Sequence, residues 1–458
     1  MAEWQEACGV FGFYDMDGFN TAEMVYYGLF ALQHRGQESC GIAVNDNGKI
    51  IYHKEKGLLG EVFDKTVLSH LDGKMGIGHV RYGAGGSNQR EDAQPLVAKY
   101  TKGHMAIAHN GQLVNGKALR EEFERAGSIF QSNSDAEVVA ALLSRHRVKN
   151  RTLEDALAET MRTIKGAYAL VLMTPHKIIA ARDPLGMRPL VIGKKANSYI
   201  IASETSALTA VGASYVRDVR PGEIVVVNGD GLRSMVTDVP HKTALCLFEF
   251  IYFARPDSDI DGASVYQARF EAGRQLAREY QIDADIVIGV PDSGLIAAMG
   301  YANYSKVPYA DGLLKNRYIG RTFIQPSQAM REQSVVMKLS PIRSQIEGKR
   351  VIMIDDSIVR GTTSKIIVKI LKDAGAKAVH MLSCSPPVKY PCHFGIDTSE
   401  KETLIANTHT MDEIRKAIGA DSLGFLSLEG LVQTPKGAKS NFCKACFDGR
   451  YPIAIEEA

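Results

Sequence analysis

The chain has 458 residues, of which 45% are hydrophobic and 23% charged, a balance typical of a soluble enzyme with more than one core. Its 54 basic and 52 acidic residues leave a formal net charge of +2, which gives no electrostatic reason to expect nucleic acid or an anionic membrane as partner. Residues 1–7 lack the apolar stretch of a signal peptide, and no apolar run reaches the about 18 residues that a membrane-spanning helix needs. We therefore predict a cytoplasmic protein whose seven cysteines serve catalysis or metal binding rather than disulfides.

Up to about residue 230 the chain alternates short strand-like runs with glycine-containing turns. We expect strands at residues 10–14, 41–44, 50–53, 105–108, 169–173, 178–181 and 224–227. Helical periodicity predicts helices over 21–33, 135–146 and 152–164, with Asp135 and Thr152 as candidate N-caps. This pattern favours layered antiparallel sheets covered by helices.

Beyond about residue 260 the pattern changes to strand, glycine-rich turn and helix. The runs at 286–290 and 351–354 are apolar throughout, which suits strands of a parallel sheet covered on both faces. The change of pattern falls between Asn228 and Asp261. We therefore expect one domain over residues 8–240 and a second over residues 241–458.

The most specific segment of the chain is 351–363, with the sequence VIMIDDSIVRGTT. A buried strand delivers Asp355 and Asp356 to its carboxyl end, where α/β proteins bind their ligands. The hydroxyl and glycine residues that follow lead into a helix, whose free N–H groups and positive dipole end suit a phosphate monoester. Adjacent carboxylates can bind ribose hydroxyls or a hydrated Mg²⁺. The plain alternative is a strand and turn with Asp356 as N-cap, and the ordered combination argues against it.

This segment resembles the signature of the type I phosphoribosyltransferases, which use phosphoribosyl pyrophosphate (PRPP). The resemblance implies that Asp355 and Asp356 face the ribose and Mg²⁺, that the next residues cradle the 5′-phosphate, and that a second loop contacts pyrophosphate. The basic, glycine-hinged stretch 315–323 has the composition of a lid, although a solvated loop would have it too. The implied site residues are Asp292, Ser293, Gly294, Asp355, Asp356, Ser357, Arg360, Gly361, Thr362 and Thr363, with Ser293, Asp355 and Asp356 as Mg²⁺ ligands.

Cys8 would become the first residue if the polar leader, residues 1–7, were removed. The freed α-amino group has a pKa near ~7.7 to 8. It can therefore accept the thiol proton, as terminal amines do for threonine nucleophiles. Taken alone, a cysteine at this position is more often a small buried hydrophobe, and only the rest of the chain favours the nucleophile.

Four short motifs accompany Cys8: QHRGQE at 33–38, GHVRY at 78–82, HNG at 109–111 and NSD at 133–135. The ordered set is similar to the N-terminal-nucleophile glutamine amidotransferases, whose fold is a four-layer αββα sandwich. The resemblance implies Cys8 as nucleophile, Arg81 as clamp for the glutamine α-carboxylate, Asp135 as partner of its α-ammonium, and Asn110 with Gly111 as the oxyanion hole. A guanidinium fork holds a carboxylate bidentately, and an amide with a backbone N–H stabilises an oxyanion. Asn110–Gly111 also fits a hairpin turn.

Joined in one chain, the two modules imply one reaction. Ammonia from glutamine displaces pyrophosphate from carbon 1 of PRPP and gives 5-phosphoribosylamine, the first committed step of purine synthesis. The segment FEFIYFARPDS at 248–258 is also typical of such enzymes. A rival joins the same glutaminase to a sugar-phosphate isomerase or an amide-forming ATP-dependent domain, and residues 355–363 argue against it. A PRPP-sensing regulatory protein would leave the intact glutaminase set without a purpose.

Four cysteines of the C-terminal half remain: a C-x2-C pair, Cys443 and Cys446, and two isolated residues, Cys246 and Cys392. Such thiols can hold a [4Fe–4S] cluster or Zn²⁺, and by spacing alone unligated cysteines fit too. One branch of the PRPP-dependent amidotransferases carries both a cleaved leader and a [4Fe–4S] cluster. The resemblance implies these four residues as ligands of a structural cluster and residues 1–7 as a propeptide. We expect the other two to be packed small residues: Cys40 and Cys384.

The same resemblance implies the small molecules and partners of the protein. Glutamine and PRPP would be the substrates, Mg²⁺ and the [4Fe–4S] cluster the cofactors, and purine nucleotides the feedback inhibitors. A homotetramer is expected, with no nucleic acid or membrane partner.

Overall fold

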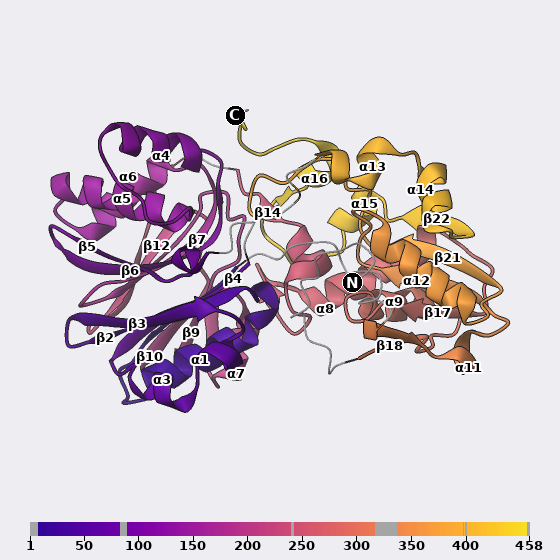
Figure 1. The fold of residues 1–458 in the computed structure, drawn as a ribbon, viewed down its shortest axis with the longest axis horizontal. Coiled ribbons are helices and arrows are strands. Elements are labelled where there is room, and N and C mark those ends of the chain that lie inside the picture. Colours follow the sequence, from indigo (N-terminus) through magenta and orange to yellow (C-terminus); the bar gives the residue numbers. More distant parts are fainter. Residues whose placement is uncertain are drawn as a thin grey trace.

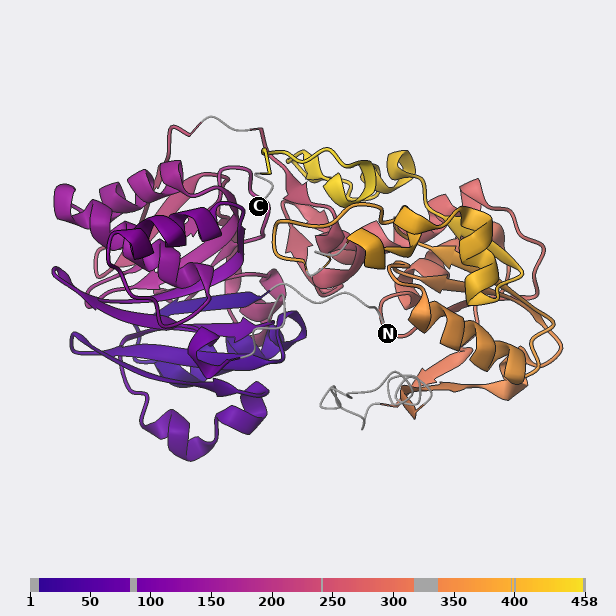
Figure 2. The ribbon, with the colours of Figure 1, turned by 45° about the horizontal axis from the view of Figure 1, so that its top comes forward.

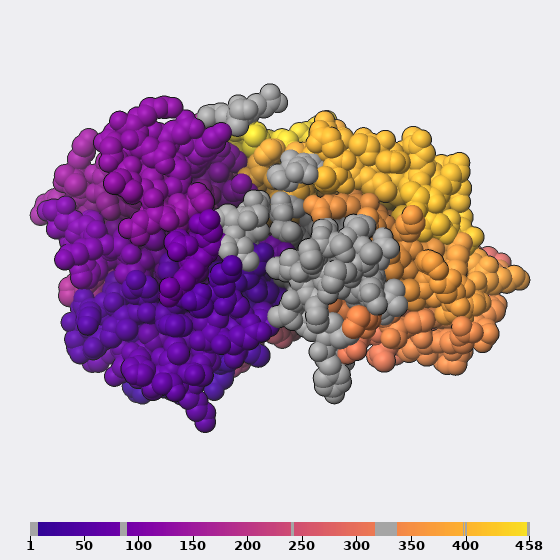
Figure 3. Space-filling view, viewed as in Figure 1, coloured from indigo at the N-terminus to yellow at the C-terminus, as the bar shows by residue number. Residues whose placement is uncertain are grey.

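A computed structural model describes residues 8–82, 89–239, 242–316, 337–396, 398 and 401–455. The chain forms two halves that lie side by side, the N-terminal one in indigo to magenta and the C-terminal one in orange to yellow (Figure 1). The space-filling view shows the same division (Figure 3). Within the described residues, no helix has the length and apolar character needed to cross a membrane.

Two antiparallel sheets form the centre of the N-terminal half, in the orders β11-β9-β10-β1-β4-β2-β3 and β13-β12-β8-β7-β6-β5. The first contains β1 (Gly9–Tyr14), β2 (Ser39–Asp46), β3 (Lys49–Lys56), β4 (Met75–Arg81), β9 (Val191–Lys195), β10 (Ser198–Ala202) and β11 (Ser214–Asp218). The second contains β5 (Leu96–Tyr100), β6 (Gly103–Leu113), β7 (Gly166–Met173), β8 (Ile178–Arg182), β12 (Glu223–Asn228) and β13 (Gly231–Val236).

Helices cover the outer face of each sheet. Those on the first sheet are α1 (Thr21–Ala31), α2 (Leu59–Val62), α3 (Lys65–Ser69) and α7 (Thr205–Ala210), and those on the second are α4 (Gly116–Arg125), α5 (Asp135–Lys149) and α6 (Leu153–Thr163). Neighbouring side chains of a strand point to opposite faces. Val10 of β1 accordingly packs between the sheets, whereas Phe11 packs under α1. The result is the four-layer αββα sandwich that the resemblance implies.

The predicted elements of this half are present, with two local differences. The first helix ends at Ala31, and a short 3-10 turn, η1 (Gln33–Arg35), follows it. Ser134, not Asp135, caps α5, because the Ser134 hydroxyl accepts the N–H of Ala136 at 3.2 Å while the Asp135 carboxylate accepts the N–H of Leu113 at 2.8 Å. Thr152 caps α6 as predicted.

A four-stranded parallel sheet, in the order β17-β20-β21-β22, forms the centre of the C-terminal half. Its strands are β17 (Ile286–Gly289), β20 (Arg350–Asp355), β21 (Ala378–Ser383) and β22 (Ser422–Phe425). Val287 and Ile352 face one core with α8 (Val265–Glu279) and α9 (Leu295–Ser305), whereas Ile288 and Met353 face the other with α12 (Thr362–Asp373) and α14 (Met411–Ile418). Burial on both faces explains the continuous apolar runs.

Short elements connect these layers. They are the 3-10 helices η3 (Arg90–Asp92) and η5 (Lys401–Thr403), the π-helical turn η4 (Glu249–Phe253), the helices α11 (Arg343–Ile346), α13 (Ile405–Thr408), α15 (Leu428–Val432) and α16 (Ala445–Asp448), and the strands β14 (Leu245–Cys246), β15 (Asp259–Ile260), β16 (Ala263–Ser264), β18 (Leu313–Lys315), β19 (Leu339–Pro341) and β23 (Phe442–Cys443). β23 pairs in parallel with β14. The yellow C-terminal segment thereby returns to the boundary between the two halves (Figure 2).

Candidate active site

Cys8 immediately precedes β1 and is held at both its side chain and its backbone. The Sγ atom donates to the carbonyl of Tyr82 at 3.8 Å, and the Cys8 carbonyl accepts the Nε–H of Arg35 at 3.1 Å. Burial raises the pKa of the thiol, while the bond to Tyr82 and the charges of Arg81, Arg188 and Arg35 oppose that shift. The proposed nucleophile is therefore a buried thiol, and three nearby arginines partly offset the cost of ionising it.

Asn110 and Gly111 lie in the middle of β6, paired with Ala169 and Tyr168 of β7, so they are not the hairpin turn that their sequence also fits. Asn110 is fully buried, and neither polar atom of its amide has a hydrogen-bond partner among the described residues. Gly111 has φ +139°, and a Cβ there would lie 2.1 Å from the carbonyl oxygen of Ala167. Only glycine fits this backbone.

One hydrogen bond joins the two sheets beside these residues. The ring Nε2 of His79 on β4 donates to the carbonyl of His109 on β6 at 2.9 Å. Burial lowers the pKa of His79 to about 3, so the ring is neutral. Arg81, which ends β4, lies 3.9 Å from the Asp92 carboxylate. The structure therefore brings Cys8, Arg81 and Asn110 to one end of the sandwich.

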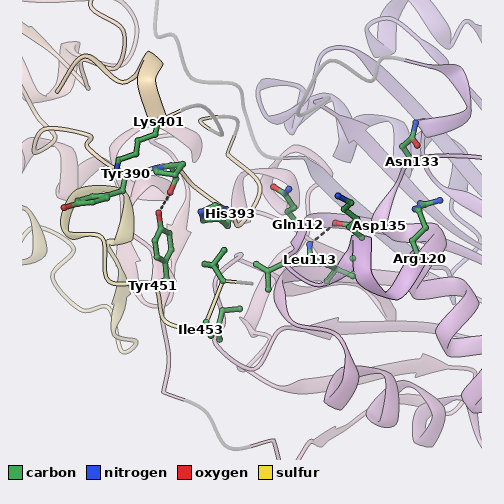
Figure 4. A pocket seen from close by; sticks show the side chains of 16 residues that line it. Gln112, Leu113, Arg120, Asn133, Asp135, Tyr390, His393, Lys401, Tyr451 and Ile453 are labelled. Atoms are coloured by element: carbon green, nitrogen blue, oxygen red, sulfur yellow. Dashed lines mark hydrogen bonds between the residues drawn. The ribbon is translucent and has the colours of Figure 1, made fainter. Parts of the chain in front are cut away.

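Asp135 lies at the first turn of α5 and lines a cavity of about 1010 Å³. Burial raises the pKa of its carboxyl to about 6, although the N–H of Leu113 and the charge of Arg120 oppose the shift. The wall opposite Asp135 comes from the C-terminal half and includes His393 and Tyr451 (Figure 4). The cavity thus adjoins the residues that follow the Asn110–Gly111 pair.

The second candidate site lies at the carboxyl ends of β17 and β20, which are neighbours in the parallel sheet. Gly294 approaches the Ile354 carbonyl so closely that a Cβ would lie 2.3 Å from its oxygen. The hydroxyls of Ser293 and Ser357 both donate to the Asp356 carboxylate. The two loops that the sequence predicted to bind PRPP therefore lie next to each other, because the carboxyl ends of neighbouring parallel strands lie at the same edge of the sheet.

Asp355 and Asp356 are both buried, with Asp355 Oδ1 accepting the N–H of Asp356 at 2.9 Å. Burial raises the pKa of both carboxyls, and the charge of Asp356 raises that of Asp355 further. At Asp356, the rise in pKa is opposed by hydrogen bonds from Ser293 and Ser357 and by the charge of Arg269. Such repulsion between buried carboxylates is relieved when a cation or hydroxyl donors bind.

Gly361 caps the helix that follows, with φ +78°, and α12 begins at Thr362. Ser357, Arg360, Thr362 and Thr363 therefore occupy the loop and first helical turn where a phosphate is expected. Asp355 also lines a cavity of about 260 Å³, together with Asp292, Ser293, Arg269, Lys315 and, from the N-terminal half, His34. Lys315 pairs with Asp292. Residues 317–323 of the predicted lid lie outside the described residues.

The four predicted cluster cysteines gather from distant parts of the chain. Cys246 lies opposite Cys443 in the β14–β23 pair, and the N–H groups of Lys389 and Tyr390 donate to the Cys446 carbonyl at 2.9 and 3.1 Å. Burial raises the pKa of all four thiols, and Cys443, Cys392 and Cys246 raise that of Cys446 further. Nevertheless, no three or more His, Cys, Asp or Glu side chains in the described ranges form a group that could hold a metal ion. Cys40 and Cys384 are buried, as predicted.

Sequence reasoning missed a buried ion network between the halves. Arg35 bonds Glu204 at 2.5 Å and Glu249 at 2.7 and 2.9 Å, and Arg188 bonds Glu249 at 3.2 Å. Burial alone would raise the pKa of Glu204, but His34 and Arg35 hold it below its usual value. Arg35 and Glu249 lie in two motifs that had no assigned role. The opposite charges of Arg35 and Glu249 were the feature of the sequence that could have indicated this contact.

Comparison with known proteins supports the presence of both a glutamine site and a phosphoribosyl site. Residues 80–210 match the glutamine amidotransferase domain family, and residues 264–384 match the phosphoribosyl transferase domain family. The chain is 50% identical to the amidophosphoribosyltransferase of Bacillus subtilis over 98% of this chain and 95% of the relative, and 48% identical to that of Methanocaldococcus jannaschii over 98% of both. The chain belongs to the amidophosphoribosyltransferase family. Its function is accordingly glutamine-dependent amination of PRPP in purine biosynthesis.

Solved structures give the same result for the fold. A B. subtilis glutamine PRPP amidotransferase complexed with ADP and GMP aligns with a TM-score of 0.92 at 49% identity, covering 98% of both chains. A structure described as the allosteric regulatory enzyme of purine biosynthesis aligns with a TM-score of 0.93 at 50% identity, covering 98% of this chain and 97% of that one. An amidophosphoribosyltransferase fold thus spans nearly the whole chain.

The buried Asp355 carboxyl predicts a stability change of known sign. Its pKa is raised in the folded state, so folding stability falls as the pH rises through the folded-state pKa. Asp355→Asn removes the charge and should raise the free energy of unfolding by about 1 to 3 kcal/mol at pH 9, with a smaller gain at pH 5. Urea unfolding at both pH values measures the difference.

Asp421→Asn is the control, and its expected change in folding stability has the opposite sign. The Val379 N–H and Lys372 hold the Asp421 pKa below its usual value against the effect of burial, so its loss should destabilise the fold at neutral pH. A stability gain for Asp355→Asn that does not grow with pH would contradict the electrostatic explanation.

Proposed function

We propose that Cys8, once it is the first residue, attacks the side-chain amide of glutamine. Its own α-amino group accepts the thiol proton, ammonia leaves, and water hydrolyses the resulting thioester to glutamate. The charges of Arg81, Arg188 and Arg35 near Cys8 support this role, because they oppose the rise in the thiol pKa that burial causes.

Four residues would bind glutamine and its transition state. The Asn110 amide and the Gly111 N–H would stabilise the oxyanion. The buried Asn110 side chain, which has no hydrogen-bond partner in the part of the chain that the structure describes, supports this assignment. Arg81 would hold the α-carboxylate. Asp135 would hold the α-ammonium, which would also favour the ionised form of a carboxyl whose pKa burial has raised to about 6.

The loops after β17 and β20 would bind PRPP. Asp355 and Asp356 would contact the ribose hydroxyls, Asp292 to Gly294 the pyrophosphate, and residues 357–363 the 5′-phosphate. Hard oxygen donors at Ser293, Asp355 and Asp356 fit Mg²⁺, which would neutralise the leaving pyrophosphate. These residues would thereby orient carbon 1 of PRPP for attack by ammonia.

One observation carries the proposal that ammonia passes directly between the sites. Arg35 holds the Cys8 carbonyl, and its neighbour His34 lines the cavity beside Asp355. A single short segment of the N-terminal half therefore contacts both candidate sites. A path of this kind would keep ammonia unprotonated and out of bulk water.

Cys8→Ala separates the two half-reactions. The variant should lose glutamine hydrolysis, yet still make 5-phosphoribosylamine from PRPP, Mg²⁺ and a high concentration of ammonia, because the loop residues are untouched. Parallel assays of glutamate and pyrophosphate release measure the two activities. Asp356→Ala is the matched variant and should abolish synthesis from either nitrogen source. Loss of ammonia-dependent synthesis in folded Cys8→Ala would refute the modular assignment.

We also propose that residues 1–7 are a propeptide and that the domains span 8–240 and 241–458. The need for a free amine at Cys8 supports the first, and the gap between β13, ending at Val236, and β14, beginning at Leu245, supports the second. Intact-mass spectrometry of active enzyme should show a chain that begins at Cys8. Full activity in protein that still begins at Met1 would overturn the first proposal.

Four cysteine thiolates are the ligand set of a [4Fe–4S] cluster, and they are also one ligand set of a structural Zn²⁺. We propose Cys246, Cys392, Cys443 and Cys446 as ligands of a structural cluster, supported by their proximity to one another and by the positive charge of Arg188 nearby. When bound, the cluster would join the C-terminal segment to the body of the protein.

Metal analysis tests the cluster. Anaerobically purified enzyme should contain about four iron atoms and four acid-labile sulfides per chain. Cys443→Ser should lose both and unfold at lower urea concentration, whereas Cys40→Ser, outside the site, should keep its iron. Stoichiometric zinc without iron would contradict the assignment.

Regulation by purine nucleotides is a further proposal, supported by the relative whose structure contains ADP and GMP. A homotetramer stays a prediction from the resemblance, and a cytoplasmic location stays a prediction from the sequence.

A further inference from the structure

Glu249 is a fully buried carboxylate from the C-terminal half that binds two arginines of the N-terminal half. Its Oε1 accepts from Arg35 Nη2 at 2.7 Å and from Arg188 Nη1 at 3.2 Å, and its Oε2 accepts from Arg35 Nη1 at 2.9 Å. All three side chains have an exposed fraction of 1% or less. Because these side chains are almost completely shielded from solvent, the position of each guanidinium depends on its carboxylate partner.

The first arginine leads to the nucleophile. Arg35 uses both terminal nitrogens on Glu249 and donates its Nε–H to the Cys8 carbonyl at 3.1 Å. The guanidinium is planar and rigid, so fixing its two ends on Glu249 also fixes the direction of Nε. Glu249 therefore helps to hold the Cys8 backbone, together with Glu204, whose Oε1 accepts from Arg35 Nη1 at 2.5 Å.

The second arginine leads to the backbone beside Asn110. Arg188 Nη2 donates to the Phe394 carbonyl at 2.7 Å. The next residue, Gly395, has φ +101°, and a Cβ there would lie 3.1 Å from the Gly111 carbonyl carbon. Through Arg188, Glu249 thus holds a loop of the C-terminal half against Gly111.

Glu249 is itself anchored to the PRPP side. It begins η4, and Arg269 donates to the carbonyls of Phe250, Tyr252 and Ala254 at 2.9, 3.0 and 2.7 Å. Arg269 lines the same cavity as Asp355. The carboxylate therefore belongs to an element whose position depends on the phosphoribosyl half.

We propose that Glu249 is a positioning residue for glutamine hydrolysis. It touches neither substrate, and acts by holding Cys8 through Arg35 and by holding the loop that backs Gly111 through Arg188. The C-terminal half thereby supplies part of the alignment that the glutaminase reaction needs. The inference rests on the proposed roles of Cys8 and Gly111.

Glu249→Gln keeps the side-chain shape and removes the charge. The kcat for glutamine hydrolysis should fall about 10- to 100-fold, the cost of misplacing reacting groups by about 1 Å, with little change in the KM for glutamine. Ammonia-dependent synthesis should fall much less, so the ratio of glutamine-dependent to ammonia-dependent rates drops at least tenfold. Labelling of Cys8 by an electrophilic glutamine analogue should slow in parallel.

Glu223→Gln is the matched control. Glu223 is also buried and holds Arg217 through two bonds of 2.8 Å, but this pair lies on β11 and β12, away from the site. It should lower stability without changing the ratio of the two rates. An equal change of the ratio in both variants would reduce Glu249 to a structural role and overturn the proposal.

A second pair tests the Arg188 arm if Glu249→Gln does not fold. Gly395→Ala places a methyl group against Gly111 and should lower the kcat for glutamine hydrolysis selectively. Gly231→Ala has a similar φ of +110° with no atom within 4 Å, so it reports backbone strain alone. An unchanged glutaminase in Gly395→Ala would overturn this arm. Retained glutaminase in Cys8→Ala would instead refute the proposed function.

Discussion

A buried set of opposite charges at the boundary between the halves is the interaction on which both candidate sites depend. Arg35, Arg188, Glu204 and Glu249 have almost no exposed side-chain surface. Removing such ions from water costs several kcal/mol each, and only well-formed pairing offsets that cost. Since the bonds of Glu249 to Arg35 and Arg188 form only when the halves meet in one orientation, they select that orientation more than they add stability.

The same cations connect the chemistry of the two halves. Arg188 lies close enough to lower the pKa of Cys8 on one side and of Cys246 and Cys392 on the other. His79 and His109 contribute no charge at neutral pH, because burial lowers the pKa of His79 to about 3 and of His109 to about 4. The Arg188 guanidinium is therefore a positive charge that the two groups of cysteines share.

The sites also carry arrangements that oppose folding. Asp355 and Asp356 are adjacent buried carboxyls, the Asn110 amide lacks a partner among the described residues, and Gly111 has a left-handed φ. Each costs free energy that the layered cores around it must offset. That these features coincide with the residues singled out for PRPP and glutamine is the physical support for their assignment.

The sequence alone determined the two fold classes and the loops that carry the phosphoribosyl site, because strand alternation, apolar runs and the Asp355–Thr363 order are local properties. It predicted the wrong cap for α5, since the choice between Ser134 and Asp135 depended on where Leu113 of another strand lies. The Arg35–Glu249 pair, 214 residues apart, was decided only by the tertiary structure. So was the contact of Gly395 with Gly111. Such contacts depend on how two finished domains dock, and no periodicity along the chain encodes which distant side chains then meet.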